Sequence, residues 1–96
     1  MARNGTKATG LVLRLYVAAN APNSVMAIAN VKAICEAHFA TVHELEIVDS
    51  LKHPLRALAD GIIVTPTLVK LFPLPVQRVI GNLSDTAQLL AALGNK

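Results

Sequence analysis

Two segments with strand periodicity enclose one segment with helical periodicity, and this order limits the fold more than any other feature of the chain. Residues 11–18 read LVLRLYVA, apolar on one face and mostly apolar on the other, which is typical of a strand covered on both sides. From Val25 the apolar residues follow helical spacing, after a start (NAPNS, residues 20–24) that offers capping oxygens and a proline. Residues 43–49 read HELEIVD and alternate again, which predicts a strand with one solvated face. The order therefore predicts a βαβ unit with a right-handed crossover.

The middle of the chain predicts a short helix followed by two strands. Residues 50–61 (SLKHPLRALADG) favour a helix that begins at Pro54 and ends at Gly61. Strands are expected over residues 68–72 and 76–80, and the Pro-Leu-Pro turn between them makes an antiparallel pair.

A last helix completes the order of elements. Ser84 is expected to cap a helix over residues 87–93, with Gly94 as its left-handed end. The full order is βαβαββα, which is that of the thioredoxin arrangement: an α/β fold with a four-stranded mixed sheet and helices on both faces. That fold places a proline, usually cis, just before its third strand, so Pro66 is the cis-proline candidate.

The composition agrees with one packed unit. Of the 96 residues, 53% are apolar and 16% are charged, which supports a core and argues against disorder. We expect a flexible tail over residues 1–10 and a single domain over residues 11–94. No membrane span is expected, because the longest uncharged stretch (residues 15–31) is interrupted by Asn, Pro and Ser. The polar start does not read as a signal peptide, and the single cysteine favours a reducing, cytoplasmic location.

The formal net charge of +3 does not indicate a nucleic-acid partner. Three of the nine basic residues lie near the ends of the chain, and the remaining six balance the six acidic residues. Binding of nucleic acid needs a basic stripe or an aromatic stacking platform, and the sequence has neither.

No residue pattern in the chain is typical of a catalytic or metal site. A thioredoxin-like oxidoreductase needs a reactive cysteine at the start of its first helix, whereas Cys35 lies about three turns into the helix, on the apolar stripe. Cys35 is therefore predicted to be an inert core thiol. His38, His43 and His53 match no compact zinc spacing, and Ser24 is expected to cap the helix rather than act as a nucleophile. We expect no enzymatic activity, no cofactor and no metal.

Several short stretches carry a resemblance to a known family, with equal spacing from about Leu11 to Leu93. They are residues 13–18 (LRLYVA), 22–25 (PNSV), 47–49 (IVD), 65–68 (TPTL), 73–76 (PLPV) and 80–85 (IGNLSD). In these stretches the sequence closely resembles the KaiB family, and a weaker likeness extends to the KaiB-like sensor domain of the SasA histidine kinase.

The resemblance implies a non-enzymatic regulatory component of a circadian clock. KaiB proteins bind the N-terminal ring of the KaiC ATPase, displace SasA and sequester KaiA. The implied partners are thus a KaiC-like ATPase and a KaiA-like protein, in competition with a SasA-like kinase. The family also implies two folds, a tetramer with the order βαββααβ and a thioredoxin-like monomer that binds KaiC.

The family likewise supplies candidate residues for partner binding. They lie on the second helix and on the exposed side of residues 43–49, and they are Glu46, Leu55, Arg56, Leu58, Ala59 and Gly61. Glu46 and Gly61 stand where the family usually has basic residues. The substitution Glu46→Lys is therefore expected to strengthen binding to a typical KaiC.

Three further residues are candidate fold-switch determinants. Ala92 stands where the family has glycine, Gly94 where it has an acidic residue, and Leu11 where it often has an aromatic one. Residues 87–93 contain three alanines and no β-branched residue, which favours the helix of the thioredoxin-like state over the strand of the alternative. We expect the thioredoxin-like state to dominate, as a monomer rather than a homotetramer. The alternative that stays open is a diverged thioredoxin-fold protein with a redox or stress-related role unrelated to a clock.

Overall fold

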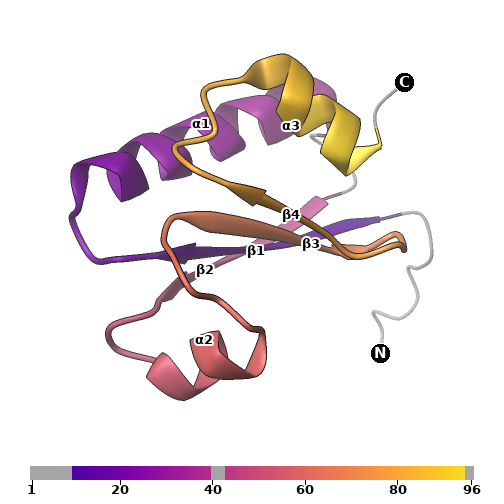
Figure 1. Cartoon of the computed structure of the whole chain (residues 1–96). Helices are drawn as coiled ribbons and strands as arrows, with labels where there is room; N and C mark the ends of the chain where they lie inside the picture. The colour runs from indigo at the N-terminus through magenta and orange to yellow at the C-terminus, as the bar shows by residue number, and fades with distance from the viewer. Residues whose placement is uncertain (1–9, 40–42, 95–96) are drawn as a thin grey trace.

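Four strands form one mixed sheet, and helices cover both of its faces (Figure 1). The computed structural model describes residues 10–39 and 43–94, so nearly all of the tail predicted over residues 1–10 lies outside the described residues. The elements are β1 (Leu11–Val17), α1 (Pro22–His38), β2 (His43–Asp49), α2 (Pro54–Ala59), β3 (Thr67–Phe72), β4 (Gln77–Ile80) and α3 (Thr86–Leu93). Their order is the predicted βαβαββα, and the predicted fold class is confirmed.

The strands lie in the order β2-β1-β3-β4. β1 runs parallel to β2, and the pairs β1/β3 and β3/β4 are antiparallel. β1 therefore lies inside the sheet, as its nearly continuous apolar sequence predicts. β2 lies at an edge of the sheet. Ile47 lies on the face opposite the glutamates of this strand, but the edge position leaves it 38% exposed. The Thr65–Pro66 peptide bond before β3 is cis.

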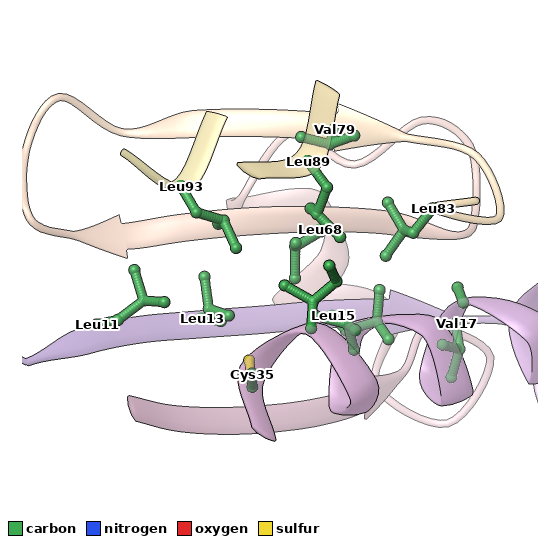
Figure 2. Close-up of a cluster of buried hydrophobic side chains, with 13 residues drawn as sticks. Leu11, Leu13, Leu15, Val17, Cys35, Leu68, Val79, Leu83, Leu89 and Leu93 are labelled. Atoms are coloured by element: carbon green, nitrogen blue, oxygen red, sulfur yellow. The ribbon is translucent and has the colours of Figure 1, made fainter. Parts of the chain in front are cut away.

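The larger of two apolar clusters lies between the sheet and the pair of helices α1 and α3 (Figure 2). Figure 2 shows Leu13 and Leu15 of β1 close to Leu68 of β3, with Leu89 of α3 above them. Cys35 of α1 belongs to this cluster and is fully buried. Burial of these side chains holds α1 and α3 on one face of the sheet.

The smaller cluster lies on the other face, under α2. Its buried members are Tyr16, Val48, Ala57 and Val69. Only one of these, Ala57, comes from α2 itself. The apolar attachment of α2 to the sheet is therefore slight.

Two of the three predicted helix starts need correction, whereas α2 begins at Pro54 as predicted. At α3 the N-cap is Asp85 rather than Ser84, and its carboxylate accepts a hydrogen bond from the Gln88 N–H at 3.0 Å. Ser84 lies one residue before the cap, and its own N–H donates to the side chain of Asn82 at 3.1 Å. Gly94 ends α3 at φ +89°, the left-handed conformation that was predicted.

At α1 the cap residue is Ala21, which makes no side-chain cap. The buried Ser24 hydroxyl instead accepts a hydrogen bond from the Ala18 N–H at 3.0 Å. Ser24 lies in the first turn of α1, so its hydroxyl ties the helix start to the end of β1 rather than capping the helix.

The candidate fold-switch residues lie in the first and last parts of the described residues, 10–39 and 43–94. Leu11 begins β1 and is 3% exposed in the larger cluster, where Ala92 is partly buried as well. Within the described residues no helix is both long and apolar enough to cross a membrane.

Candidate interaction surface

The parallel pairing of β1 with β2 places two opposite charges side by side on the sheet. Arg14 lies opposite Glu46 in the register, and its Nε donates to Glu46 Oε1 at 3.0 Å. Their side chains are 25% and 47% exposed. Both point to the face that carries α2, because side chains two residues apart on a strand share a face and Val48 belongs to the cluster under α2.

Arg56 of α2 binds the same carboxylate from the helix side. Its Nη1 lies 2.8 Å from Glu46 Oε2, and its Nη2 donates to Oε1 at 2.8 Å. A two-point contact between guanidinium and carboxylate is a strong geometry for an ion pair. The hydrogen bond from Arg56, with a further one from Arg14, lowers the pKa of Glu46 from 4.5 to about 2, against the opposing effect of burial. Glu46 is therefore ionised at neutral and mildly acidic pH.

Asp60, which caps the C-terminal end of α2, provides the second carboxylate. Its Oδ2 accepts from the Tyr16 hydroxyl at 2.5 Å and from Arg14 Nη1 at 2.9 Å, and that hydroxyl also lies 3.1 Å from the Arg56 carbonyl oxygen. The hydrogen bond from Tyr16, followed by that from Arg14, holds the pKa of Asp60 below its usual value. Burial is the main cause that raises the pKa of Tyr16, and the hydrogen bond to Asp60 is the second. Arg14, Tyr16, Glu46, Arg56 and Asp60 are called the charged cluster below.

The chain leaves α2 through Gly61, at a position that suits glycine. Its φ is +69°, in the left-handed region that other residues adopt only with strain. A Cβ at this position would lie 3.4 Å from Nη1 of Arg78. Arg78 of β4 donates from its Nη2 to the carbonyl oxygen of Asp60. The turn after α2 is thereby linked to the far strand of the sheet.

The outward side of α2 is apolar. Leu55 is 78% exposed and Leu58 is 74% exposed, whereas Ala57 between them is 7% exposed against the sheet. Leu51, in the turn that leads into α2, is 70% exposed. Leu51, Leu55 and Leu58 are called the apolar face below. Ile63, in the segment that leaves α2, is also largely exposed.

The six residues predicted to bind a partner fall into three groups. Glu46 and Arg56 belong to the charged cluster. The exposed surface of α2 carries Leu55, Leu58 and Ala59, and Gly61 forms the turn after this helix. The other three members of the charged cluster were not among the predicted residues: Arg14, Tyr16 and Asp60. The predicted βαβ unit indicates that residues 11–18 lie beside residues 43–49, but the register that pairs Arg14 with Glu46 is known only from the structure.

The residues considered for chemistry lie apart from one another. Burial, followed by the charge of Glu36, raises the pKa of the Cys35 thiol, which disfavours a reactive thiolate. His43 Nδ1 lies 2.9 Å from the carbonyl oxygen of Phe39. Among residues 10–39 and 43–94, no three His, Cys, Asp or Glu side chains are grouped so that they could hold a metal ion.

Comparison with known proteins shows the family of the chain. The family model described as "KaiB domain" matches residues 14–94. The chain belongs to the KaiB family. Two curated relatives are named "Circadian clock oscillator protein KaiB". The protein of Synechococcus elongatus is 50% identical over 82 residues, covering 85% of this chain and 80% of the relative. The protein of Gloeothece citriformis is 49% identical over 82 residues, covering 85% and 77%.

Solved structures show a likeness to a domain of a second protein, SasA, and to thioredoxins. The N-terminal domain of Synechococcus elongatus SasA matches with a TM-score of 0.75 and 32% identity, covering 94% of this chain and 89% of that domain. Mitochondrial thioredoxin 3 of Saccharomyces cerevisiae matches with a TM-score of 0.73 and 14% identity, over 90% and 78% of the two chains. The latter likeness shows the fold alone. Homology to KaiB and likeness to the SasA domain together support a role in a circadian clock.

Proposed function

We propose that this protein is a non-enzymatic clock regulator that binds a KaiC-type ATPase ring and modulates its output. It binds through the exposed surface of α2 and the neighbouring face of β2, as a monomer in the thioredoxin-like state. Residues 11–94 act as a single domain, in the cytoplasm.

One observation carries the proposal: the chain is KaiB-like in sequence and also SasA-like in shape. Two domains with one shape can occupy one binding site in turn, so competition with a SasA-like kinase for the ring follows naturally. A KaiA-like protein is the further partner that the family implies. The buried Cys35 and the cysteine-free start of α1 favour this binding role over a redox role.

A binding experiment with a matched pair of variants tests the proposal. The protein is mixed with the KaiC hexamer of Synechococcus elongatus and resolved by size-exclusion chromatography. Wild-type protein is expected to elute with the hexamer, and an excess of the SasA N-terminal domain is expected to release it. Ala59→Arg, on the exposed surface of α2, is expected to weaken binding at least tenfold because the bulky cation disrupts the contact. Ala91→Arg places the same change on α3, across the sheet, and is expected to bind normally.

Failure of the wild-type protein to elute with the hexamer, or equal binding by both arginine variants, would refute the proposal. The resting state is tested separately by NMR chemical shifts at low micromolar and millimolar concentrations. Helical shifts over residues 88–93 at both concentrations are expected. Strand shifts together with a tetramer-sized hydrodynamic radius would contradict the proposed monomer.

A further inference from the structure

The inner and outer sides of α2 differ sharply in chemistry. Resting on the proposed function, we infer that the apolar face recognises the partner, whereas the charged cluster acts inward to hold α2 on the sheet. The partner surface then has an apolar centre and acidic edges.

The charges of the cluster are compensated within the protein. Arg14 and Arg56 balance Glu46 and Asp60, and every one of these four side chains takes part in an ion pair of 3.0 Å or less. Arg14 contacts both carboxylates, so the cluster is continuous from β2 to the end of α2. A partner would have to break these contacts to use the charges, which makes them poor recognition elements.

The cluster has a structural task, because α2 has little else to hold it. A helix of six residues is too short to be stable alone. Ala57 is its only buried residue. The contacts of Arg56 with Glu46, and of Asp60 with Arg14 and Tyr16, therefore replace the apolar packing that holds a longer helix in place.

The outward side has the opposite character. Leu55 and Leu58 lie three residues apart on α2, so they share one side of the helix. With Leu51 before them, each member of the apolar face is at least 70% exposed. Large apolar side chains gathered on the surface of a monomer are a common mark of a contact site.

The charges beside the apolar face define the rest of the partner. Lys52 is exposed in the turn next to Leu51, and the exposed Arg78 uses a donor on a backbone carbonyl rather than on a carboxylate. The cluster itself sums to zero, and among the described residues the carboxylate beside Leu51 is that of Asp49, which accepts a hydrogen bond from the Leu51 N–H at 2.9 Å. The two cations outnumber it, so the surroundings of the apolar face keep a net positive charge. Acidic side chains at the edges of the partner surface complement them.

The first test separates apolar from charged recognition with variants matched in exposure. Binding to the KaiC hexamer is measured for Leu58→Ala, Leu74→Ala and Lys52→Ala. Leu58 and Leu74 are 74% and 72% exposed, but Leu74 lies in the turn between β3 and β4. We expect an affinity loss of about tenfold for Leu58→Ala and less than threefold for the other two. Equal losses at Leu58 and Leu74, or a loss at Lys52 that exceeds the loss at Leu58, would overturn the inference.

If the wild type does not bind KaiC, that result refutes only the proposed function. Two measurements on the protein alone then still decide the inference. On a phenyl-agarose column, the double variant Leu55→Ala/Leu58→Ala is expected to elute earlier than wild type and Leu74→Ala. Arg56→Gln is expected to raise amide hydrogen exchange in residues 54–60 at least fivefold, with exchange in α1 unchanged. Unchanged elution overturns the outward role, and unchanged exchange overturns the inward one.

Discussion

Replacing Glu46 by glutamine tests whether the charged cluster stabilises the fold. Glutamine keeps the length and shape of the side chain but removes the charge that both Arg14 and Arg56 contact. The two arginines then lie near each other with one carboxylate fewer, that of Asp60 remaining. We therefore expect Glu46→Gln to lower the free energy of unfolding at pH 7.

The size of the effect follows from the pKa and the exposure of Glu46. A fall in pKa from 4.5 to about 2 corresponds to roughly 3 kcal/mol at about 1.4 kcal/mol per pKa unit. The side chain is 47% exposed, so solvent screens the interaction. The expected loss is consequently about 1 kcal/mol, within the range measured for partly exposed ion pairs. In a domain of this size it corresponds to a fall in Tm of roughly 4–8 °C.

Urea unfolding of wild type and variant at pH 7, 4 and 3 measures the loss and its pH dependence. The folded-state pKa of Glu46 lies below the unfolded value, so its stabilisation is complete above about pH 5 and is lost as pH falls from 4.5 towards 2. The gap between wild type and Glu46→Gln should therefore narrow at pH 3. Glu36→Gln, an exposed change on α1 outside the cluster, is the control and is expected to change stability by less than 0.5 kcal/mol.

A double-mutant cycle with Arg56→Gln isolates the contact between the two side chains. If the two side chains act through one ion pair, the summed stability losses of the single variants should exceed the loss of the double variant by about 0.5 kcal/mol or more. Additive losses, or a gap between wild type and Glu46→Gln that stays constant down to pH 3, would refute this reasoning.

The charged cluster also affects what is expected of Glu46→Lys, because a third cation beside Arg14 and Arg56 repels both. Any gain in affinity from a basic residue at this position must therefore be measured against a loosened α2.

Three further predictions concern single residues outside the cluster. Cys35→Ser is expected to leave binding to KaiC unchanged and to cost about 1 kcal/mol of stability by urea unfolding, since the site is fully buried. Asp85→Ala should cost about 1 kcal/mol through loss of the N-cap of α3, whereas Asp85→Asn should restore most of it. Gly94→Ala should cost roughly 1 kcal/mol because its φ of +89° is left-handed, although nothing lies within 4 Å of an added Cβ; Gly94→Asn should be milder.

The order of elements could be predicted from the sequence because each element depends on residues close along the chain. Three such signals are the apolar run of β1, the alternation in β2 and the helical spacing of α1, and the glycine after α3 is a fourth. The helix caps were less predictable, because several neighbouring residues carry the same local signal. Asn82, Ser84 and Asp85 are all suitable caps by composition. In the structure Asn82 forms a turn with the Ser84 N–H, and Asp85 caps the helix.

The charged cluster could not be predicted, because its members meet only in three dimensions. Arg14 is 32 residues from Glu46 and 46 residues from Asp60. The first pairing depends on the register between β1 and β2, which is fixed by the length of α1 and its connections. The second depends on how α2 is rotated over the sheet. Neither quantity can be obtained from local propensity. The equal numbers of basic and acidic residues away from the chain ends are likewise no sign of clustering.

The orientation of α2 on the sheet differs from the one that its sequence predicts. By ordinary amphipathic reasoning, a helix with the sequence PLRALA would bury its two leucines and expose its arginine. The structure does the reverse: Arg56 reaches the carboxylate on β2, Ala57 packs on Tyr16 and its neighbours, and Leu55 and Leu58 face outward. This orientation forgoes the free energy of burying two leucines, about 3 kcal/mol or more. Such a sacrifice of folding stability is expected where a surface serves a contact rather than the core. The same reversal explains why substitutions at Glu46 and at Leu58 should report on different properties, the first on stability and the second on affinity.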